Sequence, residues 1–498
     1  MNADLLITQF DRIAEVPDAV PRLRRFILDL AVRGRLVKSN YKNVDLRLEG
    51  CDIEWVSTVP ENWQVNRLGS LITLEYGKAI SKEERQGGAV PVYGSNGIIG
   101  YSESFLTNKP AIIIGRKGSA GSLNIADGPS WTSDVAYYVI PPPNYDIRFL
   151  YLMLSVLDLP NLAKGVKPGL NRNDVYDLVG VLPPLAEQHR IVAKVNALMT
   201  VCDELEVQQR EREAQRDRTV MAMSHKLVHE SPADQSLAKT VQFYLRNFAD
   251  LTVRREHVQQ WRRTILDLAV RGRLVEQDSE DEPIFSSLKV GREVVKGPYE
   301  LPLTWQWHAV GDITTNHGQK VPDSDFIYID VSAIDATRGV IESPQILRAT
   351  EAPSRARRIV QFDDVIYSTV RPYLLNVAVI DQDYTLPAIA STAFVVLSGI
   401  GLTVPRYLWL VLRSPYFVKL VEEQMRGQAY PAINDRAFKE LPIPLPPLAE
   451  QHRIVAKVNE LMTVCDALEQ QLSMQEQDAE RFMEAVLHGM LTPVVQRI

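Results

Sequence analysis

The stretch LPPLAEQHRIVAKVNALMTVCDELE covers residues 182–206, and the chain repeats it as LPPLAEQHRIVAKVNELMTVCDALE at residues 445–469. The two copies differ at only two positions. An internal repeat of this strength decides the architecture, because both copies must be given the same structural role. We therefore interpret the 498-residue chain as one unit that has been duplicated.

A second repeated motif lies upstream in each copy. ILDLAVRGRLV occurs unchanged at residues 27–37 and 265–275. Between the shared motifs the two copies hardly resemble each other, so the plan is constant, variable, constant, written twice. Segments that diverge on a constant frame are where recognition tends to lie. The alternative is a duplicated domain whose middle diverged without purpose.

The repeated stretches predict long helices. Residues from about 185 to 229 contain no Pro or Gly, and their apolar residues step by four and three, which is the heptad spacing of a coiled coil. Two such helices in one chain can form an intramolecular antiparallel coiled coil, with the cysteines packed in its seam and without a redox role. The seam residues are Ile191, Val195, Leu198, Cys202 and Leu205, and then Ile454, Val458, Leu461, Cys465, Leu468, Leu472, Phe482 and Val486.

Each variable part has the pattern of an α+β domain with short strands, and a helix precedes it. The preceding helices would end near Gly34 and Gly272 and dock on the long helices. In the first part we predict strands at 111–115 and 131–140 and a helix at 149–157. In the second we predict strands at 326–331, 364–368, 376–380 and 393–397 and a helix at 407–423. The two parts are predicted to be two versions of one fold with different surfaces.

The predicted domains follow the repeat. They are N-terminal conserved helices at 1–40, a first variable domain at 41–183, a central conserved helix at 184–235, the conserved helices of the second repeat at 236–280, a second variable domain at 281–446, and a C-terminal conserved helix at 447–498.

Composition and motifs give no support for catalysis. The net charge is −7, from 55 basic and 62 acidic residues, which argues against binding of nucleic acid by bulk charge alone, so any contact must come from local patches or be helped by basic partners. No phosphate-binding Gly-x-x-x-x-Gly-Lys-Ser/Thr loop and no Asp/Asn-Pro-Pro-aromatic tetrapeptide of adenine methyltransferases occurs. Three cysteines without a Cys-x-x-Cys pair favour a reducing cytoplasm, and we expect no metal or cofactor site in this chain.

Local features of the variable parts suit a DNA duplex, because Arg and Asn can pair with base edges and Gly-rich turns allow close approach to phosphate. Each position alone is also compatible with an ordinary surface residue, and the prediction depends on their recurrence in two copies. The candidate DNA-binding residues in the first part are Lys78, Ser95, Asn96, Arg116, Lys117, Ser119, Lys164, Lys167, Asn171 and Arg172. In the second part they are Arg355, Arg357, Arg358, Ser368, Thr369, Arg371, Tyr373, Gln428, Tyr430, Asn434 and Arg436.

The doubled motifs ILDLAVRGRLV and LPPLAEQHRIVAKVNALM resemble the conserved regions of type I restriction–modification specificity subunits. YGSNGIIGY, IIIGRKGSAGS and FDDVIYSTVRP are similar to target-recognition domains of that family. The resemblance implies two target-recognition domains separated by a long antiparallel helical pair, with pseudo-twofold internal symmetry. Each domain would read half of a split DNA site, and the helices would set the gap between the halves.

The same resemblance implies partners. Two methyltransferase subunits would pack on the conserved helices and supply S-adenosylmethionine-dependent adenine methylation. Motor-nuclease subunits would supply ATP- and Mg²⁺-dependent restriction. The chain itself would be a non-catalytic cytoplasmic subunit of a prokaryote. Two other classes stay open: a self-contained nuclease or methyltransferase, and a coiled-coil scaffold with two protein-binding domains.

Overall fold

The computed structural model describes residues 19–38, 41, 43–45, 58–165, 169–229, 243, 252–283, 295–427 and 430–491. The chain forms two compact units. Unit 1 comprises Met1–Glu213 and Glu476–Ile498, and unit 2 comprises Ala214–Gln475. The division falls inside both long helices, α6 (Leu185–His229) and α13 (Leu448–Leu491), so each unit contains a part of each. Within the described ranges, every helix is too short or too polar to traverse a lipid bilayer.

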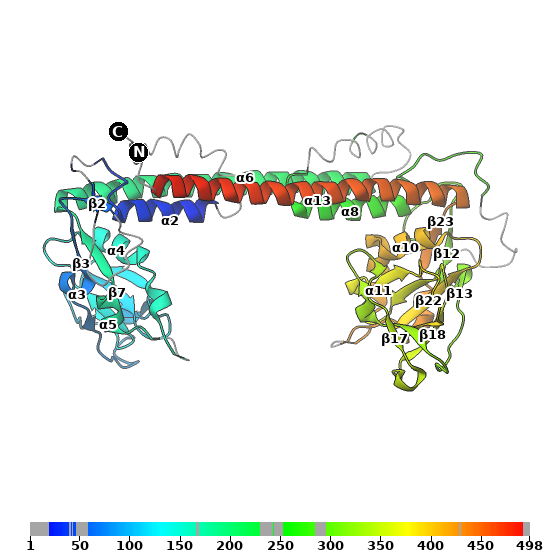
Figure 1. The fold of residues 1–498 in the computed structure, drawn as a ribbon, viewed down its shortest axis with the longest axis horizontal. Coiled ribbons are helices and arrows are strands. Elements are labelled where there is room, and N and C mark those ends of the chain that lie inside the picture. The colour runs from blue at the N-terminus through cyan, green and yellow to red at the C-terminus, as the bar shows by residue number, and fades with distance from the viewer. Residues whose placement is uncertain are drawn as a thin grey trace. The chain divides into compact units, whose positions relative to one another are not determined.

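Unit 1 combines a β-rich domain with helices from the conserved segments (Figure 1). Besides α6, its helices are α2 (Ala19–Val32), α3 (Leu68–Leu71), α4 (Ile147–Val156), the 3₁₀ turn η1 (Leu159–Leu162) and α5 (Arg172–Tyr176). Its strands are β1 (Asn43–Asp45), β2 (Thr58–Pro60), β3 (Gln64–Arg67), β4 (Glu75–Tyr76), β5 (Val90–Gly94), β6 (Gly97–Ser102), β7 (Ala111–Gly115), β8 (Leu123–Ala126), β9 (Trp131–Thr132), β10 (Ala136–Val139) and β11 (Val179–Leu182).

Unit 2 has the same kinds of element. Besides α13, its helices are α8 (Arg255–Val270), α9 (Val310–Ile313), α10 (Pro405–Arg413), α11 (Pro415–Gln424) and α12 (Asp435–Lys439), with 3₁₀ turns η3 (Val331–Ala333), η4 (Ala349–Glu351) and η5 (Pro372–Leu374). Its strands are β12 (Gln306–Ala309), β13 (Thr314–Thr315), β14 (Phe326–Ile329), β15 (Ile334–Asp335), β16 (Val340–Ile341), β17 (Gln345–Leu347), β18 (Ala356–Val360), β19 (Val365–Ser368), β20 (Val377–Val379), β21 (Ala388–Ser391), β22 (Phe394–Gly399) and β23 (Pro442–Leu445).

The two β-rich domains share the topology of one sheet, whereas the second sheet has three strands in unit 1 (β6-β5-β9) and four in unit 2 (β17-β14-β21-β18). A four-stranded sheet has the order β4-β10-β7-β8 in unit 1 and β13-β22-β19-β20 in unit 2. The second sheet of each unit contains one parallel pair, β5 with β9 and β14 with β21. A short antiparallel pair, β3 with β11 and β12 with β23, leads into the long helix. The prediction of an α+β class and of two versions of one fold is therefore confirmed.

Each short conserved helix docks on a long helix, as predicted (Figure 1). Arg24 of α2 pairs with Asp203 and Glu206 of α6 at 2.5 and 3.1 Å. Arg262 of α8 makes the equivalent pairs with α13, at 2.6 Å to Asp466 and 3.1 Å to Glu469. The repeated sequence therefore encodes a repeated helix–helix contact in each unit.

The first four residues of each predicted seam are buried and Leu205, Leu468 and Leu472 are half-buried, but the main partner of the seam differs from the prediction. Ile191, Val195, Leu198 and Cys202 lie in one apolar core with α2 and α4 residues such as Phe26. In unit 2, Ile454, Val458, Leu461 and Cys465 share a core with α8, and Val220 and Leu227 of α6 join it. Heptad spacing indicates only that one helix face is apolar, and here the short helix and the β-rich domain cover most of it.

Both seam cysteines, Cys202 and Cys465, are buried free thiols, and burial raises the pKa of Cys465 to about 11. The side chains of Phe482 and Val486 lie outside the described ones.

The repeated Leu-Pro-Pro-Leu-Ala-Glu-Gln motif fastens the β-rich domain to the long helix. The buried Gln188 amide donates to the carbonyls of Asn144 and Pro183, and its oxygen accepts from the Asp146 N–H, each at 2.8 Å. Asp146 is the N-cap of α4. The motif thus sets where α4 starts relative to α6.

Two predicted elements are wrong in their extent. The strand predicted at 131–140 is two strands, β9 and β10, interrupted by residues 133–135. The helix predicted at 407–423 is two helices, α10 and α11, which separate at Ser414. Pro415 disfavours a helical conformation of Ser414 and lacks an N–H, so it begins a new helix instead of continuing one.

Candidate nucleic-acid interface

The same loop leaves the four-stranded sheet in both units. In unit 1, the Arg116 N–H donates to Val135 O at 2.9 Å, and its carbonyl accepts from Leu170 N at 2.8 Å. In unit 2, Thr369 makes the equivalent bonds, to Ala393 O at 2.8 Å and from Ile433 N at 3.0 Å. The frame is therefore shared, while the side chain at this place is Arg in one unit and Thr in the other.

A cluster of arginine and tyrosine side chains forms at this loop in unit 1. The guanidinium carbons of Arg116 and Arg172 lie 5.2 and 5.1 Å from the ring centroid of Tyr76. Arg172 lies also over Tyr176, and Arg116 over Tyr137. Cation–π contacts of this kind hold a guanidinium in place and leave its N–H groups able to donate.

Tyr76 is the functional candidate that sequence reasoning missed. The residue is 46% exposed, and its ring packs edge-on to that of Tyr137 at 5.0 Å between centroids. Burial, followed by the interaction with Tyr76, raises the pKa of Tyr137 to about 12, so its hydroxyl stays protonated and donates to Leu170 O. The available signal was its position in the sequence, because Tyr76 lies two residues before the candidate Lys78 and directly before Gly77.

Unit 2 has a simpler counterpart. The guanidinium carbon of Arg371 lies 4.9 Å from the ring centroid of Tyr430, which is 70% exposed. Arg371 adopts a left-handed conformation with φ +48°, and its N–H donates to Pro431 O at 2.9 Å. A non-glycine residue held in this region costs about 1–3 kcal/mol, and such strain concentrates at functional sites. Tyr373 is exposed on the same loop, in η5.

The remaining candidates of unit 1 are mostly on the surface. Asn96 is exposed and Ser95 half-buried in the turn between β5 and β6, while Lys78, Lys117 and Ser119 are exposed. Ser95 and Ser119 both accept a hydrogen bond from the Ser122 hydroxyl through their carbonyls. Gly118 and Gly121 have φ of +81° and +83°, so the chain turns at the glycines that follow Arg116 and Lys117.

Several candidates are already occupied by contacts inside their own unit. Ser368 and Thr369 are buried, and their hydroxyls donate to Val370 O and Ala393 O, so we correct both assignments. Arg358 pairs with Asp435 at 2.5 Å, and Arg357 donates to the Ala356 carbonyl at 2.7 Å. A side chain committed in this way is poorly placed to read a base.

Two of the three asparagine candidates act as helix caps. Asn171 accepts from Asn173 N and starts α5, and Asn434 accepts from Ala437 N and starts α12, each at 2.9 Å. Lys164 pairs with Asp174 and Arg436 with Glu440, while Arg355 is exposed. Lys167 and Gln428 lie outside the described residues.

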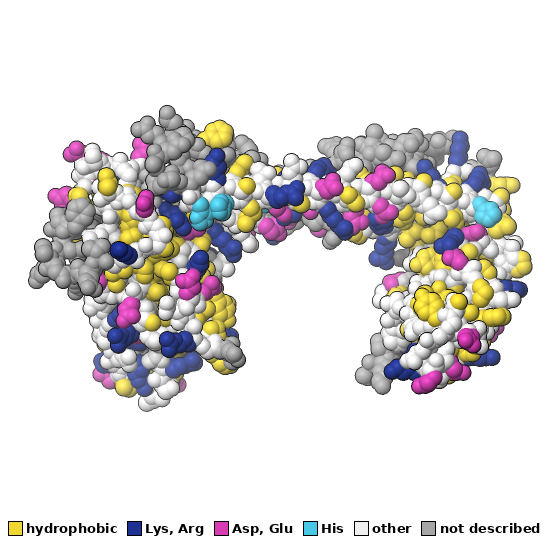
Figure 2. Space-filling model, turned by 180° about the vertical axis from the view of Figure 1, so that it is seen from behind, with side chains coloured by type: hydrophobic (Ala, Val, Ile, Leu, Met, Phe, Trp, Pro, Cys, Tyr) yellow, Lys and Arg dark blue, Asp and Glu magenta, His cyan; other side chains and the backbone are white. Residues whose placement is uncertain are grey.

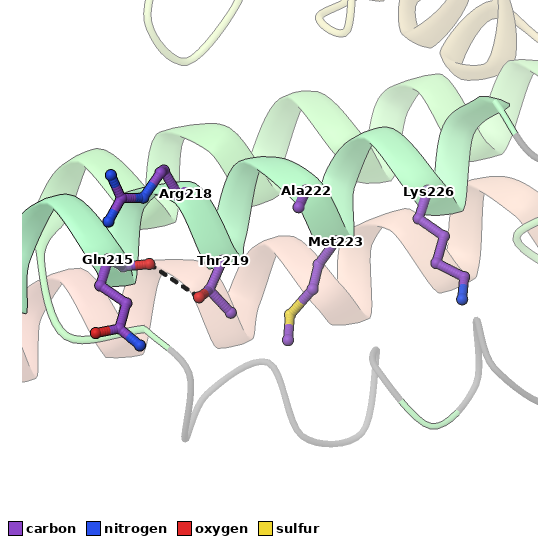
Figure 3. Close-up of a pocket in the computed structure, with 6 residues that line it drawn as sticks. All are labelled: Gln215, Arg218, Thr219, Ala222, Met223 and Lys226. Atoms are coloured by element: carbon purple, nitrogen blue, oxygen red, sulfur yellow. Dashed lines mark hydrogen bonds between the residues drawn. The ribbon is translucent and has the colours of Figure 1, made fainter.

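The surface charge is mixed, as the net charge predicted. On the face drawn in Figure 2, Lys and Arg side chains lie among Asp and Glu side chains and do not form one continuous basic field. A hollow of about 440 Å³ lies along α6, and Figure 3 shows its described lining residues, from Gln215 to Lys226. These come from a single helix face, so the hollow brings together no groups from separate elements.

Comparison with known proteins identifies the family. The chain matches the family described as "Type I restriction modification DNA specificity domain" over residues 60–215 and again over 303–475. The chain belongs to this family, and it contains two copies of the domain. The resemblance read from the repeated motifs is confirmed.

The curated relatives are named accordingly. The chain is 22% identical to the type I restriction enzyme EcoDI specificity subunit of Escherichia coli, over 83% of this chain and 84% of the relative. It is 21% identical to the EcoEI specificity subunit of the same species, over 95% and 94%.

Two solved structures are also similar. One is the HsdS subunit from Thermoanaerobacter tengcongensis, with 36% identity over 38% of this chain and 50% of that chain and a TM-score of 0.35. The other is a chain from a study of the assembly and conformational transition of the type I R-M system, with 18% identity over 87% and 98% and a TM-score of 0.46.

Proposed function

We propose that this chain is the DNA sequence-recognition subunit of a type I restriction–modification complex, and that each β-rich domain reads one half of a bipartite site. The long helices set the gap between the halves and dock two methyltransferase subunits. Motor-nuclease subunits complete the restriction complex. Cofactors belong to the partners: S-adenosylmethionine, ATP and Mg²⁺. The chain has no active site of its own and works in the prokaryotic cytoplasm.

One observation supports this most directly. Equivalent four-stranded sheets hold the same loop by the same backbone bonds, but the loop arginine is Arg116 in unit 1 and Arg371, two residues after the buried Thr369, in unit 2. A frame that is kept while the presented side chains change is what two readers of different sequences require. Arg116, Arg172 and Tyr76 in unit 1, and Arg371 and Tyr430 in unit 2, are the refined contact residues.

The test is methylation mapping. The chain is expressed with its cognate methyltransferase subunit, and methylated adenines are sequenced across the host genome. We expect one two-part motif with a constant gap. Methyl transfer or DNA cleavage by the purified chain alone would favour a self-contained enzyme and contradict the proposal. A complex that neither methylates nor binds duplex DNA would favour the scaffold alternative.

A further inference from the structure

Each unit has a groove where the β-rich domain meets its long helix. In unit 1 the groove has a volume of about 390 Å³, and α4 and α6 line it together with β8. In unit 2 a groove of about 360 Å³ is lined by α10 and α13, with Arg338 at its edge. Both volumes lie near the lower end of the usual range for binding pockets. Each groove can therefore hold a few side chains of a partner but not a whole helix.

The two grooves are built from equivalent positions. Gln188 bonds Asn144 O and Asp146 N, and Gln451 bonds Leu402 O and Val404 N, which fixes how α4 corresponds to α10. With that alignment, the matching lining pairs are Arg148 with Arg406, Tyr151 with Trp409, Leu152 with Leu410, Val192 with Val455, and Asn196 with Asn459. Four of these pairs are identical, and in the fifth one aromatic side chain, Tyr151, is replaced by another, Trp409.

The chemistry of the grooves is also the same. Arg148 pairs with Asp127 just after β8 at 2.8 Å, and Arg406 pairs with Asp381 shortly after β20 at 3.0 Å. Both pairs are substantially exposed, so the attraction is weak and a second carboxylate can compete for the guanidinium. The described lining residues include no acid, and Leu and Val side chains form the apolar part.

We propose that these two grooves dock two copies of one partner protein, each through a segment that presents a carboxylate beside an aliphatic side chain. The carboxylate bonds Arg148 or Arg406, the aliphatic side chain covers Val192 or Val455, and the exposed amide of Asn196 or Asn459 bonds the segment's backbone. The inference rests on the proposed function, under which the partner is the methyltransferase subunit.

The two grooves have similar linings although the two β-rich domains differ, which indicates that both grooves bind the same partner. The loops after the four-stranded sheets, which carry Arg116 in unit 1 and Arg371 in unit 2, differ in sequence, as readers of two different DNA sequences must. The grooves instead keep one arginine, one aromatic, two aliphatic residues and one asparagine in both. A surface that reads DNA sequence has no reason to stay the same, whereas a surface that binds two identical subunits must.

The experiment blocks one groove at a time. Asn196→Trp and Asn459→Trp place a large ring at the mouth of the unit 1 or unit 2 groove, from exposed positions that leave the core intact. The matched controls, Ala197→Trp and Glu460→Trp, alter the adjacent exposed residues, which do not line the grooves. Native mass spectrometry of the full chain with the cognate methyltransferase subunit gives the stoichiometry, and calorimetry gives the affinity.

We expect two methyltransferase subunits on the wild-type chain and on both controls, one on each single Trp variant, and none on the double variant. Binding at the blocked groove should weaken about tenfold or more. Arg148→Glu combined with Arg406→Glu should do the same by charge reversal, which covers the case in which the Trp variants lower the unfolding midpoint.

The outcomes separate the two proposals. Wild-type binding of two subunits, with unchanged stoichiometry and affinity in the double Trp and double Glu variants, would overturn the groove assignment and leave the proposed function standing. Equal losses in the controls would overturn it too. Loss of duplex binding with unchanged methyltransferase binding would assign the grooves to DNA. A wild-type chain that binds no methyltransferase would remove both proposals.

Discussion

Gln188 and Gln451 make the same three hydrogen bonds, each inside its own unit. Gln451 donates to Leu402 O at 2.9 Å and to Pro446 O at 3.0 Å, and accepts from Val404 N at 2.7 Å. Both side chains are fully buried. A buried glutamine in the first turn of each long helix thus satisfies three backbone groups where the β-rich domain joins that helix.

Replacing either glutamine by leucine should destabilise its unit by about 3 kcal/mol, because the side chain keeps its size but leaves those backbone groups unpaired. Chemical denaturation of Gln188→Leu and Gln451→Leu measures the loss. Gln215→Leu, at an exposed position of α6, is the control and should change the free energy of unfolding by less than about 0.5 kcal/mol. Equal effects at all three positions would contradict this account.

Gly34 and Gly272 should not tolerate alanine. Both have a left-handed φ, +68° and +67°, just after the end of a conserved helix. An added Cβ would lie 2.5 Å from Pro60 Cδ or 2.4 Å from Pro302 Cγ. We expect each substitution to lower the free energy of unfolding by about 1–3 kcal/mol.

The control for these glycines is Gly128→Ala, since Gly128 has no positive φ and no atom within 4 Å of a built Cβ. It should leave the unfolding midpoint unchanged or raise it slightly. Thermal unfolding followed by circular dichroism checks all three variants. An unchanged midpoint in Gly34→Ala would show that the helix end can relax.

The sequence predicted the extent of the long helix and the ends of the short conserved helices, because both depend on residues close together in the chain. The run without Pro or Gly predicted α6 over the residues where it lies, and the ILDLAVRGRLV motif predicted both helix ends at glycine. The partner of the heptad face was not predictable, because spacing reveals an apolar face and not what covers it. The break between α10 and α11 was signalled by Pro415 and overlooked.

The candidate interface was predicted at the level of loops and less well at the level of side chains. Arg116, Arg172, Arg371 and Tyr430 come together with aromatic or cationic partners at those loops. Ser368 was wrongly predicted to face solvent, because the sequence does not distinguish a serine whose hydroxyl is exposed from one whose hydroxyl bonds a neighbouring carbonyl. Tyr76 was missed because its neighbours become adjacent only in the folded sheet.

The buried thiols should react slowly with alkylating reagents. Burial raises the pKa of Cys465 from 9.0 to about 11, so at pH 9 about one hundredth of the native thiol is thiolate, against about half in the unfolded chain. Burial also raises the pKa of Cys202. Mass spectrometry after iodoacetamide treatment, with and without urea, should show protection of both residues that diminishes as the pH rises towards 11. Rapid native labelling at pH 8 would contradict the burial.

Arg116→Ala and Arg371→Ala should each weaken specific DNA binding by the methyltransferase complex. A base-reading arginine accounts for about 1–3 kcal/mol and its loss relaxes one position of the motif, whereas loss of a phosphate contact weakens all sequences alike. Competition binding with substituted duplexes distinguishes the two. Lys109→Ala removes an exposed charge outside the candidate set and should have the smaller effect. If neither arginine variant differs from Lys109→Ala, the residue assignments are wrong.

Shortening both long helices should narrow the gap in the recognised site. Deletions inside 191–205 or 454–468 would remove core residues such as Val195 and Val458, so the deletions belong at 207–213 and 470–476, which contain no buried residue. Removing seven residues shortens a helix by about 10 Å, a length that corresponds to about three base pairs of DNA. The same deletion rotates the helix face by only about 20°. Sequencing of methylated adenines should therefore return both half-sites unchanged, with the gap shorter by about three base pairs. A control with only one helix shortened puts the pair out of register and should lose activity. Unchanged spacing in a folded, active double deletion would mean that another part of the complex sets the distance between the two readers.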